Sequence, residues 1–146
     1  MGKAALNGGG KSFQVEMSVR DYELDQYGVV NNSVYNNYLE HTRHDFLTEV
    51  GLDAAGVAAE GRSLALSRLS VHYRASLRSK ERFRVRLRVS SLSGARVTFY
   101  QEIHKIPEDL LMLEAWAEAV FLDERGRPMR VAPEHKAMFL PYLMAE

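Results

Sequence analysis

The sequence predicts an α+β protein in which an antiparallel sheet of about five strands wraps around one long central helix. Three observations predict this class: one long helical pattern near the N-terminal third, one strand pattern before it, and four strand patterns in succession after it. The chain of 146 residues fits a single domain. Since a sheet must cover its apolar face, and this helix is the one element long enough to do so, the helix is expected to lie across the sheet.

The long helix is predicted to begin between residues 31 and 33, where Asn, Asn and Ser are all good N-caps, and to end at Gly51. At 1.5 Å per residue its length would be about 27 Å, which is enough to cross a small domain. Its core-facing positions recur every three or four residues, as a helix with one broad buried face requires. These positions are Val34, Tyr35, Tyr38, Leu39, Thr42, Phe46, Leu47 and Val50.

Strands are predicted over residues 12–20, 63–77, 81–91, 96–106 and 110–123, because apolar and polar side chains alternate there. The alternation slips near residues 67 and 68, which indicates a β-bulge. Strands that follow one another through short turns are expected to pair antiparallel. A short helix or turn is predicted at 52–61, and a short last helix from Pro133 to about Tyr142. Residues 1–11 are predicted to be a disordered N-terminal segment before a single domain over 12–143.

The composition excludes several classes of protein. A net charge of zero argues against general binding of nucleic acid. No run of eighteen apolar residues is present to form a transmembrane helix. The chain has no cysteine, which removes disulfides, zinc–thiolate sites and a thiol nucleophile, and which suits an intracellular compartment.

A carboxylate stands just before the long helix. Asp25 lies in an acidic loop over residues 21–28, close to the helix N-terminus. Unpaired N–H groups and the helix dipole favour negative charge at that point. A carboxylate that faces backbone donors across a gap is the arrangement an enzyme needs to attack a carbonyl group. The spacing alone slightly favours a simple turn residue.

The motif DxxGxVxxxxY, which runs from Asp25 to Tyr35, resembles the active-site motif of hotdog-fold thioesterases of the 4-hydroxybenzoyl-CoA thioesterase class. Glu40 and Arg43 match positions that are often Glu and Arg in that class. The longer string VRDYELDQYGVVNN, followed by NYLEHTRHDFL, is closer to plant fatty acyl-ACP thioesterases related to methylketone synthase. Bacterial members usually carry aromatic or His residues where this chain has the pair Asn31 and Asn32, and the plant group shares that pair.

The resemblance implies hydrolysis of fatty acyl-ACP, of the medium-chain or 3-oxoacyl type, without a metal or cofactor. Asp25 would attack the thioester carbonyl or activate a water, and the backbone N–H near Asn32 would hold the oxyanion. Arg43 would be the third catalytic residue. The residues implied to bind substrate are Asn31, Tyr35 and Glu40. The alternatives are an acyl-CoA thioesterase of the 4-hydroxybenzoyl type and a non-catalytic acyl-binding hotdog protein.

The resemblance also implies a homodimer or homotetramer whose sites lie between chains. It implies the plastid stroma as the compartment if the plant likeness holds, and otherwise the cytoplasm. Several residues keep a second interpretation. Tyr35 and Tyr38 fit a core as well as a site, and Arg43 could simply pair with Glu40. His41 and His44 lie three residues apart on the same helix with no third metal ligand nearby, so no metal site is predicted.

A basic strand is the second feature of the sequence. Seven basic residues occur in this stretch against Glu81 alone: Arg74, Arg78, Lys80, Arg82, Arg84, Arg86 and Arg88. One interpretation is a solvated outer face of the sheet with arginines that protect an edge. The other is a patch for an acidic carrier protein or for the phosphates of CoA.

Overall fold

The computed structural model describes residues 10–52 and 54–145, so most of the segment predicted to be disordered lies outside the described residues. The elements follow one another in an order close to the predicted one. They are β1 (Phe13–Ser18), η1 (Asp21–Glu23), α2 (Asn32–Glu49), α3 (Ala54–Ala59), β2 (Ser63–Tyr73), β3 (Arg82–Ser93), β4 (Arg96–Ile106), β5 (Leu110–Leu122), α4 (Pro133–Phe139) and η2 (Leu140–Tyr142). The two η elements are single turns of 3₁₀ helix.

The strands form one antiparallel sheet in the order β1-β3-β4-β5-β2. The expected pairing of successive strands is confirmed for β3 with β4 and for β4 with β5. It fails for β2, which pairs with β5, because β1 takes the free edge of β3. The predicted bulge in β2 is confirmed, since the register with β5 shifts between Leu66 and Arg68. As a result β1 and β2 are the two edge strands of the described sheet.

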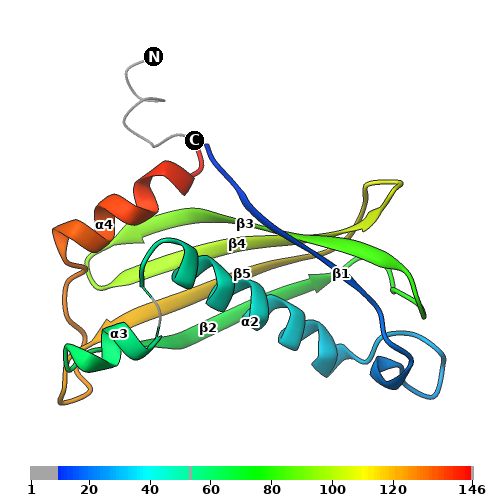
Figure 1. Cartoon of the computed structure of the whole chain (residues 1–146), viewed down its shortest axis with the longest axis horizontal. Helices are drawn as coiled ribbons and strands as arrows, with labels where there is room; N and C mark the ends of the chain where they lie inside the picture. The colour runs from blue at the N-terminus through cyan, green and yellow to red at the C-terminus, as the bar shows by residue number, and fades with distance from the viewer. Residues whose placement is uncertain (1–9, 53, 146) are drawn as a thin grey trace.

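The helix α2 lies across one face of this sheet, as the hotdog fold requires (Figure 1). Its start lies beside the loop that follows β1, at the opposite end of the molecule from α4. Leu39 and Phe46 on its inner face are completely buried, and they belong to two apolar clusters that fill the space between helix and sheet. Gly51 follows the helix with φ of +86°, a conformation that suits glycine at a helix end. The predicted fold class and helix bounds are therefore confirmed.

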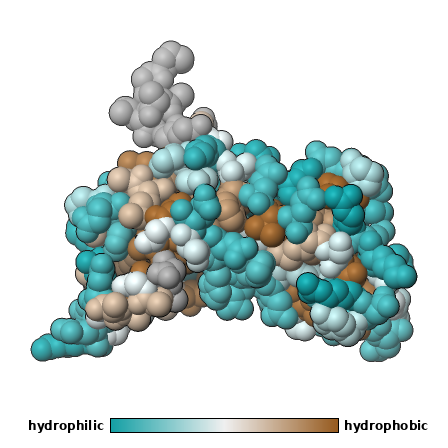
Figure 2. All heavy atoms as spheres, in the orientation of Figure 1, coloured by the Kyte–Doolittle hydropathy of each residue, from teal (hydrophilic) through white to brown (hydrophobic). Residues whose placement is uncertain are grey.

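The face that carries α2 is a mixture of polar and apolar surface. Figure 2 shows several brown apolar patches between the teal polar side chains on this face. Across the described part of the chain, no helix combines the length and the apolar character needed to cross a membrane. The exposed apolar patches of this face are the kind of surface that contacts other molecules.

Candidate active site

The loop before α2 is anchored to the helix by a buried carboxylate. Glu23 in η1 is only 8% exposed, and its side chain accepts hydrogen bonds from the Tyr38 hydroxyl (2.7 Å) and the Arg20 N–H (2.9 Å). Its backbone carbonyl accepts a hydrogen bond from the N–H of Asn31 (3.0 Å). Burial, and then the hydrogen bond to Glu23, raise the pKa of Tyr38, so this hydroxyl stays a donor. One residue therefore fixes both ends of the loop against α2.

Asp25 closes a tight turn within this loop. Its N–H donates to the carbonyl of Val29 (2.8 Å), and the N–H of Gly28 donates to its carbonyl (3.1 Å). Gly28 has φ of +76°, which glycine adopts without strain. The Oδ1 atom of Asp25 accepts from the N–H groups of Tyr27 (2.8 Å) and Val29 (3.4 Å). The Oδ2 atom has no hydrogen-bond partner among the described residues, so one oxygen holds the turn and the other is available.

The first turn of α2 leaves one backbone donor available. Asn31 is the N-cap, and its Oδ1 accepts from the N–H of Ser33 (3.0 Å) and from the Ser33 hydroxyl (2.9 Å). The N–H of Val34 donates to the carbonyl of Asn31 (2.9 Å). Within the part of the chain that the structure describes, the N–H of Asn32 has no acceptor. An unpaired N–H at the positive end of an eighteen-residue helix is suited to stabilise negative charge.

Tyr35 lies beneath this helix start as part of the core. It is 2% exposed, and its hydroxyl accepts a hydrogen bond from the N–H of Leu77 (2.9 Å). Burial raises the pKa of Tyr35, and the hydrogen bond from Leu77 acts in the opposite direction. Its ring lies 5.7 Å from the ring of Tyr73 at the end of β2. Its hydroxyl is thus committed to holding the segment that follows β2 beside the start of α2.

Arg43 and Glu40 lie elsewhere on the helix. Arg43 comes eleven residues after Asn32, about 17 Å along the axis at 1.5 Å per residue. Its Nη1 donates to Oε1 of the fully buried Gln101 (3.0 Å), and Gln101 Nε2 donates to the carbonyl of Leu39 (3.0 Å). Burial lowers the pKa of Arg43, while the nearby charge of Glu40 raises it. A single chain therefore brings Asp25, Asn32 and Tyr35 together and leaves Arg43 apart from them.

Sequence patterns alone did not identify Gln101 and Glu23, the two buried polar side chains that bond to α2, although each left a signal in the sequence. Gln101 interrupts the otherwise apolar inner row of β4 between Phe99 and Ile103, and such an interruption indicates a buried polar partner. Glu23 gave a weaker signal, because an acidic residue in a loop is usually solvated. Its partner Tyr38 is fifteen positions away, beyond the range of local patterns.

The helix histidines and the arginines of β3 lie beside carboxylates. His41 lies 3.2 Å from Asp45, and His44 lies 4.0 Å from Glu40. The described residues contain no group of three or more side chains that could hold a metal ion. Each β3 arginine lies beside a carboxylate. These pairs are Arg82 with Glu16 (2.9 Å), Arg84 with Asp109 (3.0 Å), and Arg86 (3.9 Å) and Arg88 (3.6 Å) with Glu102.

The geometry at the start of α2 suits attack on a carbonyl carbon. Asp25 supplies an oxygen with no hydrogen bond, and Asn32 supplies a backbone donor that costs no reorganisation when charge develops. The turn of Asp25 and the cap of Asn31 are both fixed by hydrogen bonds, so these groups are held before a substrate arrives. A carbonyl whose oxygen meets the Asn32 N–H could present its carbon to the Asp25 side.

Known proteins resemble the chain over nearly its whole length. Residues 19–139 match the family described as the thioesterase-like superfamily. The acyl-acyl carrier protein thioesterases ATL3 and ATL2 of Arabidopsis thaliana, both named as chloroplastic, are 45% and 43% identical to it. These alignments cover 89% and 91% of this chain and 68% and 70% of the two relatives.

Solved structures show the same fold. Slr0204 from Synechocystis, a 1,4-dihydroxy-2-naphthoyl-CoA thioesterase, superposes with a TM-score of 0.82 at 18% identity, covering 88% of this chain and 96% of that protein. The hypothetical protein TT1821 from Thermus thermophilus superposes with a TM-score of 0.79 at 29% identity, covering 88% and 98%. The family match, the Arabidopsis relatives and the shared architecture agree, and the chain belongs to the thioesterase-like superfamily.

Proposed function

We propose that this protein hydrolyses the thioester of a fatty acyl group carried by acyl carrier protein. The observation that carries the proposal is the pairing of an Asp25 oxygen without a hydrogen bond and the unpaired N–H of Asn32 at one helix start. The names of the two Arabidopsis relatives support the carrier as acyl carrier protein, and they support the plastid as the compartment.

The reaction can follow either of two balanced routes. In the first, Asp25 takes a proton from water as the water oxygen attacks the carbonyl carbon. In the second, the carboxylate oxygen attacks directly and forms a mixed anhydride, which water then hydrolyses. In both routes the carbon–sulfur bond breaks and the carrier thiolate leaves and takes up a proton. The Asn32 N–H would hold the oxyanion in each case.

A single turnover in heavy-oxygen water identifies direct attack when water opens the anhydride at the Asp25 carbonyl. If Asp25 activates water, the released fatty acid carries the label. If Asp25 attacks directly and water opens the anhydride at the Asp25 carbonyl, the first product carries no label and the protein does. Mass spectrometry of the acid and of the peptide that contains Asp25 reads out both cases.

The test of the proposal is the substitution Asp25→Asn. Asparagine keeps an oxygen that can accept from the N–H groups of Tyr27 and Val29, so the turn should survive. Turnover of acyl-ACP should fall by about 10²–10⁴-fold, the usual cost of losing a general base. Asp21→Asn, a change of the same kind four residues earlier, is the matched control and should stay within about threefold. A folded Asp25→Asn protein with nearly normal turnover would show that the reaction runs elsewhere.

The proposal includes a homodimer that forms along β2. This edge strand is eleven residues long, and its side chains Leu66 and Tyr73 are 49% and 47% exposed. A long edge of this kind is a template for another strand. Two β2 strands related by a two-fold axis would run antiparallel, so the Tyr73 end of one copy would lie beside the Ser63 end of the other.

Such a dimer would bring an Arg43 side chain close to Asp25, which a single chain does not do. The Tyr73 end of β2 lies next to Tyr35 at the start of α2, whereas Leu64, near the other end, lines a cleft with Arg43. Antiparallel pairing of two copies would therefore carry the helix start of one subunit toward Arg43 of the other. This supports a shared site in which Asp25 and Arg43 come from different chains.

A further inference from the structure

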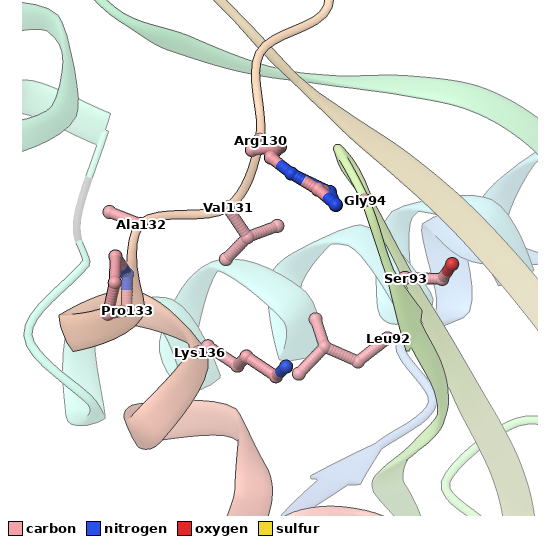
Figure 3. Close-up of a pocket in the computed structure, with 8 residues that line it drawn as sticks. All are labelled: Leu92, Ser93, Gly94, Arg130, Val131, Ala132, Pro133 and Lys136. Atoms are coloured by element: carbon pink, nitrogen blue, oxygen red, sulfur yellow. The ribbon is translucent and has the colours of Figure 1, made fainter.

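A cleft lies at the end of the molecule opposite the start of α2 within one chain. Its volume is about 690 Å³, and it lies between the turn that joins β3 to β4 and the segment that leads into α4. In Figure 3 the side chains of Arg130 and Lys136 extend from that segment and from α4 toward Gly94 and Leu92 at the turn. Its lining is Leu92, Ser93, Gly94, Arg130, Val131, Ala132, Pro133 and Lys136.

The charges of this cleft are not neutralised. Arg130 and Lys136 are exposed, neither makes an ion pair with a described carboxylate, and no acidic residue lines the cleft. The basic strand is different, because its arginines Arg84 and Arg86 lie beside Asp109 and Glu102. Positive charge available to an acidic partner is thus found in the cleft rather than on β3.

The cleft also has a fixed apolar floor. Leu92 and Val131 are half-buried within it, and Pro133 forms part of its wall. The N–H of Val131 donates to the carbonyl of Gly94 (2.9 Å), which holds the two walls together. Because the backbone is held in this way, little conformational freedom would be lost when a partner binds.

We propose that this cleft, lined by Arg130 and Lys136, is the docking surface for the carrier protein. This rests on the proposed function, since it names where the carrier of the thioester binds. The fitting partner is an acidic helix that places carboxylates against the two cations and apolar side chains on the floor between them. Charge complementarity of this kind steers encounter and fixes orientation.

The position of the cleft agrees with the proposed dimer. Ser63 at the start of β2 pairs with Leu122 of β5, and Leu122 also bridges to Pro128, two residues before Arg130. The segment that carries Arg130 therefore lies about two strand spacings, roughly 10 Å, from that end of β2. Antiparallel pairing of β2 would bring the partner's helix start toward the same end. A carrier in the cleft of one subunit would then deliver its acyl group to Asp25 of the other.

The experiment compares two double variants that remove the same amount of charge. One is Arg130→Gln with Lys136→Gln in the cleft, and the other is Arg84→Gln with Arg86→Gln on β3. The cleft pair should raise KM for acyl-ACP by about five- to tenfold at low salt, since each exposed contact contributes modestly. It should leave hydrolysis of an acyl N-acetylcysteamine thioester unchanged, and the difference should shrink as salt rises. The β3 pair should leave the hydrolysis of both substrates unchanged.

Equal effects of the two pairs on acyl-ACP would overturn the proposal, because only net charge would then matter. No effect of the cleft pair would overturn it as well. Binding of acyl-ACP to the Asp25→Asn protein, with and without the cleft pair, is measured by calorimetry and does not depend on turnover. A weaker affinity with the cleft pair supports docking there even if the proposed reaction fails, whereas an unchanged affinity rules docking out.

Discussion

At the scale of single residues, the structure separates side chains that hold the loop from those available for chemistry. Glu23 and Tyr38 have their polar atoms engaged with each other, whereas Asp25 keeps one oxygen without a hydrogen bond. The hydrogen bond between Tyr38 and Glu23 is 2.7 Å long and buried, and its acceptor is a carboxylate. Bonds of this kind are among the stronger ones in proteins.

Removing the Tyr38 hydroxyl should therefore destabilise the fold. We expect Tyr38→Phe to lower the free energy of unfolding by about 1–3 kcal/mol, because Glu23 loses a donor in a buried setting. Tyr22→Phe is the matched control, since the Tyr22 side chain is 80% exposed, and it should change the value by less than about 0.5 kcal/mol. Urea unfolding measures both, and equal values for the two variants would contradict the anchoring role.

At the scale of elements, α2 could be predicted almost to the residue because its ends carry their own signals. Asn31 caps the start and Gly51 follows the end, and both act within a few positions along the chain. The strand bounds followed in the same way from alternation. The partner of β2 could not be predicted. β2 pairs with β5 rather than β3 because β1 occupies the side of β3 that β4 leaves open. That contact joins residues some seventy positions apart, which no local pattern records.

The cap at Asn31 gives a prediction at this scale. Asn31→Ala removes the acceptor for the N–H and hydroxyl of Ser33, and it should cost about 1 kcal/mol of stability. Asn31→Ser restores a capping oxygen and should recover most of that loss. Thermal unfolding of the two variants and the wild type measures the difference. A serine variant as unstable as the alanine variant would mean that Asn31 acts through another contact.

At the scale of the whole molecule, the predicted site is only partly assembled. The sequence motif indicated Asp25, Asn32 and Tyr35 as one group, and the folded chain brings them to the same helix start. Arg43 and Glu40 were indicated by the same family resemblance, yet they lie further along α2. In the proposed dimer these two residues would come from the other copy of the chain, which the sequence of one chain does not record.

The proposed dimer can be tested on β2 with a matched pair of variants. Leu66→Lys places a charge on the exposed edge, and it should weaken association at least about tenfold. Leu110→Lys makes the same change at a leucine of similar exposure, 52% against 49%, in β5 rather than in the edge strand, and it should leave association unchanged. Sedimentation velocity across micromolar concentrations gives the populations. A wild-type protein with the mass of one chain throughout would contradict a shared site.

The two oxygens of the Asp25 carboxylate have different surroundings, and this has one more consequence. The Oδ1 atom accepts hydrogen bonds from two backbone N–H groups of the turn. The carboxylate proposed to react therefore also helps to hold the turn that positions it. A glutamate at this position would keep the acidity but extend it by one methylene, past the N–H groups of Tyr27 and Val29. The turn would then lose its internal brace while the charge remained. Side-chain length at this position is thus constrained as well as ionisation: asparagine keeps the length and loses the charge, whereas glutamate keeps the charge and loses the fit to the turn.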